Sequence, residues 1–206
     1  MRLEIHNAKR DPKPDNSVVL ITGDGRTLLE DMNTFISWQI SHDVMAIGRS
    51  INVYPGKVKH WANVDGMDSV WWAEHIPNKN NGEMPIRHTM GDCRGYDVDW
   101  DIIDEIIWNP DDISWHGSTS LFAVYVCLAL GYQKIVLAGC PLDNKGHWFF
   151  GETITGPRWK GESFIAWLEF ARIEEAKRVR SFSGYTAQII GNPTKAWATG
   201  IIHSFK

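Results

Sequence analysis

A turn of small residues follows the first apolar run of the chain. The residues Gly23-Asp24-Gly25-Arg26 come directly after the β-branched run 17–22 and before a helical pattern. Small residues allow backbone N–H groups and a helix start to approach a phosphate closely. The turn lacks the third glycine of the dinucleotide fingerprint and the Gly-Lys-Ser/Thr of a P-loop. It therefore indicates either a phosphate site or an ordinary strand-to-helix turn.

Three hydroxyl side chains stand together later in the chain. Ser118, Thr119 and Ser120 follow Gly117 and open a long apolar run. A helix start with free amides and hydroxyls is a natural anion site, and Gly117 leaves room for a ligand. Ordinary helix capping explains any one of these hydroxyls equally well.

A histidine and a carboxylate could supply acid–base chemistry. His147 follows Asp143 by four residues in a polar loop. A loop histidine beside a carboxylate suits a general base, with Asp143 orienting it or binding the acceptor. The alternative is an ordinary surface histidine.

A pair of carboxylates has the spacing of a metal site. Asp97-Val-Asp99 matches the Asp-x-Asp of metal-dependent sugar-nucleotide transferases, in which two carboxylates hold Mg²⁺ or Mn²⁺ against a diphosphate. The same acidic run also suits a solvated helix start, and we favour that interpretation.

Alternating strand and helix patterns must position these groups. Apolar β-branched runs predict strands at 17–22, 43–48, 60–65, 134–139 and 186–190. Helical periodicity predicts helices at 27–40, 67–75, 121–130 and 162–180, with Lys177, Arg178 and Arg180 in the last turns of the fourth. Residues 77–101 and 144–160 are expected to be irregular loops that could act as lids. The pattern predicts one α/β domain over 1–206, Rossmann-like, with a mostly parallel sheet covered by helices on both faces.

The predicted topology groups the candidate residues. Ligands of such folds bind beyond the carboxyl ends of the strands. The residues expected there are the glycine turn 23–26, the hydroxyl residues 118–120, and also Gly48, Arg49, Asp65, Gly139 and Asp143.

Composition sets the outer limits. The 206 residues are 43% hydrophobic and 22% charged with a net charge of -4, which is typical of a globular protein and does not favour nucleic-acid binding. Three scattered cysteines (Cys93, Cys127 and Cys140) predict no disulfide framework, so we expect a reducing, cytoplasmic location. No apolar run reaches the roughly 20 residues of a membrane span. The 11 tryptophans would suit core packing or a base- or sugar-binding cleft.

Several segments together resemble one superfamily. The run Gly23-Asp24-Gly25-Arg26-Thr27-Leu28 resembles the Gly-Asn-Gly-Pro-Ser-Leu turn of the bacterial lipooligosaccharide sialyltransferases. It is also similar to the turn of the related 6-hydroxymethylpterin diphosphokinase-like and flagellin motility-accessory proteins. Residues 117–139, with a hydroxyl-rich start, a small-residue helix, Leu-Gly-Tyr and a strand ending in Gly, are the strongest match. Residues 46–50 and 64–65 resemble the ends of the second and third strands, and the likeness spans roughly 17–147.

The resemblance implies a function and a site. It implies a nucleotide, often a cytidine nucleotide sugar, bound by Gly23, Asp24, Gly25, Arg26, Gly48, Arg49, Asp65, Gly117, Ser118, Thr119, Ser120 and Gly139. The expected activity is a nucleotide-dependent transferase, foremost a glycosyltransferase with His147 as base and Asp143 beside it, and with no required metal. The alternatives are Mg²⁺-dependent diphosphate transfer from ATP, with Asp24 and Asp65 near the metal, or a non-catalytic nucleotide-binding or interaction protein. A homo-oligomer is left open.

Overall fold

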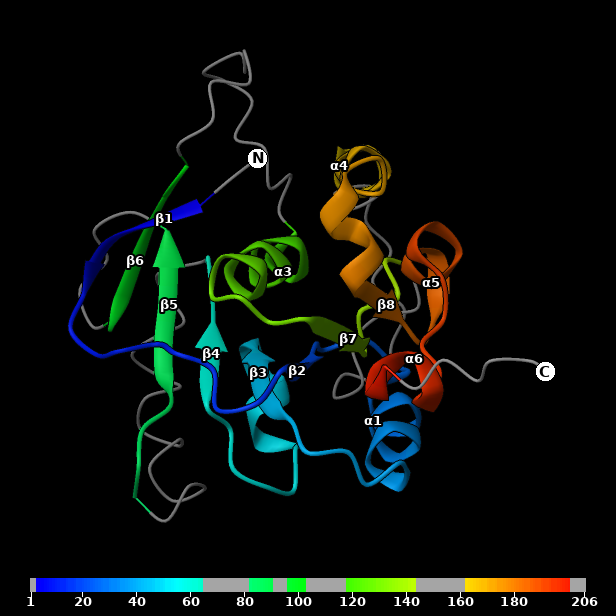
Figure 1. The fold of residues 1–206 in the computed structure, drawn as a ribbon, viewed down its shortest axis with the longest axis horizontal. Coiled ribbons are helices and arrows are strands. Elements are labelled where there is room, and N and C mark those ends of the chain that lie inside the picture. The colour runs from blue at the N-terminus through cyan, green and yellow to red at the C-terminus, as the bar shows by residue number, and fades with distance from the viewer. Residues whose placement is uncertain (1–2, 65–81, 91–95, 103–117, 144–161, 201–206) are drawn as a thin grey trace.

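One mixed sheet of eight strands organises the chain. The computed structural model describes residues 3–64, 82–90, 96–102, 118–143 and 162–200. The strands are β1 (Leu3–Ala8), β2 (Val18–Thr22), β3 (Asp43–Ile47), β4 (His60–Ala62), β5 (Ile86–Met90), β6 (Val98–Ile102), β7 (Lys134–Ala138) and β8 (Val179–Ser181). Their order is β1-β6-β5-β4-β3-β2-β7-β8, and only β1 runs antiparallel to its neighbour (Figure 1).

Helices cover both faces of this sheet, as the sequence predicts. They are α1 (Leu28–Ser37), α3 (Thr119–Ala129), α4 (Glu162–Phe170), α5 (Gly184–Ile190) and α6 (Lys195–Thr199), with 3₁₀ turns η1 (Gly48–Asn52) and η3 (Glu174–Arg178). One apolar cluster joins α3 and α4 to one face. A second cluster joins α1 and Trp197 of α6 to the other. The α/β class is therefore confirmed.

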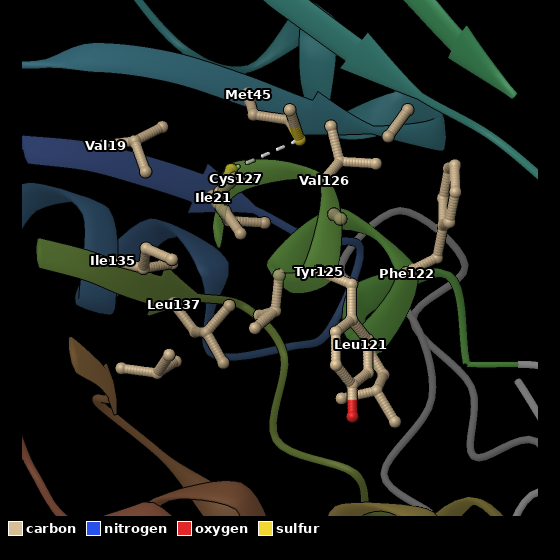
Figure 2. Packing of buried hydrophobic residues seen from close by; sticks show 14 of the residues in the cluster. Val19, Ile21, Met45, Leu121, Phe122, Tyr125, Val126, Cys127, Ile135 and Leu137 are labelled. Carbon is tan, nitrogen blue, oxygen red and sulfur yellow. Dashed lines mark hydrogen bonds between the residues drawn. The ribbon is translucent and has the colours of Figure 1, made fainter. Parts of the chain in front are cut away.

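Helix α3 is buried on almost every side because its sequence is apolar all round. Its residues pack on Val19 and Ile21 of β2 and on Met45 of β3 (Figure 2). The Cys127 thiol donates to the Met45 sulfur at 3.7 Å within this contact. Burial raises the pKa of the Cys127 thiol well above its usual range, so the thiol stays protonated.

The strongest apolar patterns predicted their elements well. The strands expected at 17–22, 43–48, 60–65 and 134–139 all appear, although β4 ends at Ala62. The helix expected at 27–40 ends at Ser37, and the helix at 121–130 starts two residues earlier. The helix expected at 67–75 lies outside the described residues.

Two predictions near the C-terminus are wrong. Residues 186–190, expected as a strand, belong to helix α5. The helix expected over 162–180 ends at Phe170, so Arg178 lies in η3 and Arg180 in β8 rather than in final helical turns. Val179 is fully buried beside β7, and pairing with that strand outweighs the local helical pattern.

The interpretation of residues 77–101 as an irregular insertion is also wrong. Strands β5 and β6 lie within it, and Trp100 is 2% exposed inside the sheet rather than in a lid. Asp97 and Asp99 do not start a solvated helix, because both are buried at β6. Arg87 contacts both oxygens of Asp97, at 3.0 and 3.2 Å, an ion pair between residues ten positions apart.

Candidate functional site

The sheet changes direction of winding at β2. Strand β3 lies on one side of β2 and β7 on the other. The strands that follow β2 therefore extend the sheet in one direction, and β7 and β8 extend it in the other. In open α/β sheets this switch point, at the carboxyl edge, is where ligands bind. The predicted residues Gly23, Gly25 and Gly139 all lie there, in the loops that follow the two strands.

These glycines pack the two loops against each other. The Gly23 amide donates to the Ala138 carbonyl and the Gly25 amide to the Gly139 carbonyl, both at 2.8 Å. A Cβ at Gly23 would lie 2.5 Å from the Cys140 sulfur, and one at Gly25 would meet the Pro141 ring. Two of the amides predicted to bind phosphate are therefore engaged in the fold, and loop packing alone explains both glycines.

A single carboxylate ties three loops together at this edge. Asp31 of α1 is 6% exposed, and its Oδ2 accepts hydrogen bonds from the Gly139 amide at 2.9 Å and the Ser183 hydroxyl at 2.7 Å. The Thr27 hydroxyl donates to the same oxygen at 2.9 Å. Sequence reasoning missed this role, although Asp31 stands out as an acidic residue within the apolar stripe of its helix.

Asp24 connects the ends of β2 and β3. Its Oδ2 accepts from the Arg49 amide at 3.1 Å, and a Cβ at Gly48 would lie 2.7 Å from the same oxygen. Gly48 has a φ of +53°, which favours glycine as well. The structure thus brings together Asp24, Gly48 and Arg49 as predicted, with Arg26 exposed on the same loop as Asp24.

The hydroxyl cluster at the start of α3 is engaged in capping. The Ser118 Oγ accepts from the Leu121 amide at 3.3 Å and from the Trp167 indole N–H at 3.3 Å. Ser118 is 3% exposed, whereas Thr119 and Ser120 are half-buried. Of the three, only Thr119 and Ser120 present surface to a ligand.

Part of the predicted site cannot be placed. His147, Asp65 and Gly117 lie outside the described residues, whereas Asp143 is half-buried at the end of the loop after β7. Within the described ranges, no three His, Cys, Asp or Glu side chains gather as a metal site would require. The Asp24–Asp65 magnesium site stays a prediction.

A buried chain of hydrogen bonds crosses the sheet on its α3 side. The Trp100 indole N–H donates to His88 Nδ1 at 3.1 Å, and His88 Nε2 lies 3.0 Å from His60 Nδ1. His60 Nε2 lies 2.9 Å from the Tyr132 hydroxyl, which donates to Asp43 Oδ2 at 2.7 Å. An indole can only donate, so each histidine carries its proton on Nε2 and every bond points from Trp100 to Asp43.

Burial fixes the protonation states along this chain. Desolvation lowers the pKa of His60 to about 3 and that of His88 well below its usual range, so both rings are neutral. Burial acts to raise the pKa of Asp43, but hydrogen bonds from Tyr132 and Asn16 outweigh it and lower the value. The chain ends at an indole inside the core, so we interpret it as structural.

A polar hollow lies at the opposite, amino-terminal edge of the sheet. It encloses about 280 Å³, and its lining includes Lys13, Lys57 and Lys59. Each of these lysines has a carboxylate partner, at 3.0 Å for Asp11 and at 2.7 Å for both Glu83 and Asp15. The charges of the hollow are therefore largely balanced within the protein.

The chain was compared with protein families, curated proteins and solved structures. No protein-family model, no curated protein and no solved structure matches the chain. Among the helices that the structure describes, none combines the length and the apolar character needed to cross a bilayer.

Proposed function

We propose that the chain binds a nucleotide at the carboxyl edge of the sheet, beside the ends of β2 and β3. The observation that carries this proposal is the link between Asp24 and Arg49 at the switch point. It fixes the loop after β2 against the start of η1, and Arg26 and Arg49 stand on these two segments. Guanidinium groups bind phosphate oxygens in a two-pronged manner.

The loop amides play a supporting part in this proposal. Because the Gly23 and Gly25 amides bond to the loop after β7, phosphate recognition rests on the arginine side chains rather than on a glycine cradle. Asp24 orients the Arg49 segment. Thr119 and Ser120, half-buried near the start of α3, are the hydroxyls we assign to the ligand's polar groups.

The reaction we propose is transfer from a nucleotide sugar, with His147 as the base and Asp143 beside it. The support is the resemblance of residues 117–139 to the sialyltransferase superfamily, together with a sheet of the expected class. A base acts in the transition state, so His147→Ala should lower turnover far more than nucleotide affinity. Unchanged turnover in this variant would reassign the base.

A thermal-shift panel tests nucleotide binding. CMP, CDP, UDP, ADP and ATP, with and without Mg²⁺, are added to the protein at millimolar concentration. A ligand that binds only the folded state raises the melting temperature. At a ligand concentration of one hundred times Kd, it adds about 2.7 kcal/mol to the free energy of unfolding. We expect a cytidine nucleotide to produce the largest shift without Mg²⁺.

Two variants assign the effect to the proposed residues. Arg49→Gln should abolish most of the nucleotide shift, whereas Arg172→Gln, an exposed arginine after α4, should leave it unchanged. Equal shifts in both variants would remove the carboxyl edge as the site. A shift only with ATP and Mg²⁺ would favour diphosphate transfer, and binding without product formation would favour a sensor.

A further inference from the structure

Three cationic side chains gather at the amino-terminal edge of β7 and β8. Lys134 is the first residue of β7, Arg178 is the last residue of η3, and Arg180 lies in β8. Ile135 pairs with Val179 and Val136 with Arg180 in parallel register, so Lys134 and Arg180 alternate with the buried Ile135 and Val179 and face the same side of the sheet. That side is the one covered by α1 and α6. Arg178 directly precedes Val179, and its charge is close enough to act on the Lys134 ammonium.

The indole of Trp197 brings two of these cations together. The Lys134 ammonium lies 4.6 Å from the centre of the Trp197 ring, and the Arg180 guanidinium carbon lies 5.3 Å from it. Trp197 itself packs against the second apolar cluster and is half-buried. The Trp197 ring therefore makes a cation–π contact with both side chains.

Among the described residues, no acidic side chain balances the charges of this cluster. Every ion pair among the described residues involves other cations, so none of the three has a carboxylate partner there. Burial, then repulsion from Arg180 and Arg178, lowers the pKa of Lys134. The cluster of cations thus carries a net positive charge in a partly desolvated place.

Arg178 adds a second, independent observation. Its Nε and Nη2 atoms are buried and have no hydrogen-bond partner among the described residues. Buried guanidinium nitrogens without acceptors are unfavourable, and native proteins rarely leave them so. Two donors on one side of a guanidinium match two oxygens of a tetrahedral anion.

We propose that Lys134, Arg178 and Arg180 form a binding site for a phosphate-class oxyanion, taken as free phosphate or as the terminal group of a small phosphate monoester. The anion accepts from the two buried nitrogens of Arg178 and offsets the mutual repulsion of the three cations. This site is distinct from the proposed nucleotide site. The five residues of β7 separate the two edges of the sheet by about 13 Å.

The alternative is a purely structural cluster, in which the cations only clamp α6 through the Trp197 ring. That account explains Lys134 and Arg180, which contact the indole. It does not explain Arg178, because its buried Nε and Nη2 atoms have no acceptor and its guanidinium shows no contact with the ring in the part of the chain that the structure describes. The two accounts predict opposite results for one variant.

Titration calorimetry with inorganic phosphate, at constant ionic strength set by chloride, tests the proposal. Glycerol 3-phosphate in a second series distinguishes free phosphate from a monoester, since the tighter of the two probes identifies the source. We expect saturable binding that Arg178→Gln weakens by about tenfold or more, because charge-assisted hydrogen bonds are lost. Arg172→Gln, an exposed arginine outside the cluster, should bind as the unchanged protein does.

The same variant has a second readout. In chloride alone, Arg178→Gln should melt at the same or a higher temperature than the unchanged protein, because removing one cation relieves repulsion. Lys134→Gln should also lose phosphate binding, and it serves if Arg178→Gln does not fold. Phosphate binding that survives both substitutions, or no binding by either probe, would overturn the proposal. Loss of nucleotide binding in Arg49→Gln would not affect these results, so the two sites are tested separately.

Discussion

At the scale of single residues, four buried hydrogen bonds link Trp100 to Asp43 across the sheet. Tyr132 both accepts from His60 and donates to Asp43. Tyr132→Phe removes both bonds and leaves a buried donor and a buried carboxylate each short of a partner. We expect it to lower the free energy of unfolding by about 1–3 kcal/mol.

Urea unfolding measures this effect, with Tyr185→Phe as the matched control. Tyr185 is 49% exposed, and its hydroxyl forms no hydrogen bond among the described residues. The control should change stability by less than about 0.5 kcal/mol. Equal effects of the two substitutions would mean that the buried chain contributes nothing.

The two buried histidines also predict the pH dependence of stability. Their folded pKa values lie below the unfolded value near 6.5, so below that pH the unfolded chain binds protons that the folded chain does not. Stability should be fully present above about pH 7 and fall by up to about 2.7 kcal/mol per pH unit in the window below 6. Below about pH 4, Asp43 and Asp97, whose pKa values are lowered, extend the loss.

Chemical denaturation between pH 5 and 8 tests this window. In His88→Gln only one of these two histidines remains, so the slope of stability against pH should fall by about half. A flat profile, or the same slope in the variant, would show that the histidines are not neutral in the folded protein.

The sequence revealed few of these residue-scale contacts. Asp43, His60 and Tyr132 are far apart in the chain, and nothing in their spacing indicates that the sheet brings them together. The same holds for Asp97, whose partner Arg87 lies in the neighbouring strand. By contrast, the capping role of Ser118 was predictable because it depends only on the residues that follow it.

At the scale of elements, the loops after β2 and β7 approach each other closely at the candidate site. Gly139 has a φ of +67°, and a Cβ there would lie 2.6 Å from the Gly23 carbonyl oxygen. Gly139→Ala therefore adds a clash with backbone to the cost of a left-handed conformation. We expect it to destabilise the protein by about 1–3 kcal/mol more than the matched change at Gly131.

Gly131 is a suitable control because it also has a positive φ, +94°, but open space where a Cβ would stand. Equilibrium unfolding of Gly139→Ala and Gly131→Ala separates the two costs. If both substitutions destabilise equally, the loops have room to adjust and the close packing at the switch point is not required.

Element prediction succeeded where the local pattern and the tertiary environment agree. Strand β2 and helix α3 are apolar because they are buried from both sides, and their boundaries were nearly right. Residues 186–190 include three β-branched residues, yet they lie in α5, where Thr186 and Ile190 are buried and the Thr186 hydroxyl donates to the Cys140 carbonyl in the loop after β7. Strand β1 was not predicted because its apolar–polar alternation covers only Leu3 to His6, and its pairing with β6 defines it.

At the scale of the whole molecule, we propose a different ligand for each of the two edges of one sheet. The carboxyl edge holds Asp24, Arg26 and Arg49 at the switch point, and we assign the nucleotide to it. The amino-terminal edge holds the cation cluster around Trp197, and we assign a phosphate-class anion to it. The α/β class was predictable from the alternation of strand and helix patterns alone. The placement of the two proposed sites at opposite edges of the sheet became clear only from the strand order.

Hydrogen–deuterium exchange with a saturating cytidine nucleotide shows which edge of the sheet the ligand covers. Bound ligand slows exchange by shielding amides and stabilising the local structure around its site. We expect increased protection at residues 23–27 and 48–53, around the loop after β2 and the turn η1, with little change at 86–90 in strand β5. No change at 23–27 and 48–53 with any nucleotide that binds, or protection confined to other parts of the chain, would contradict the proposed nucleotide site.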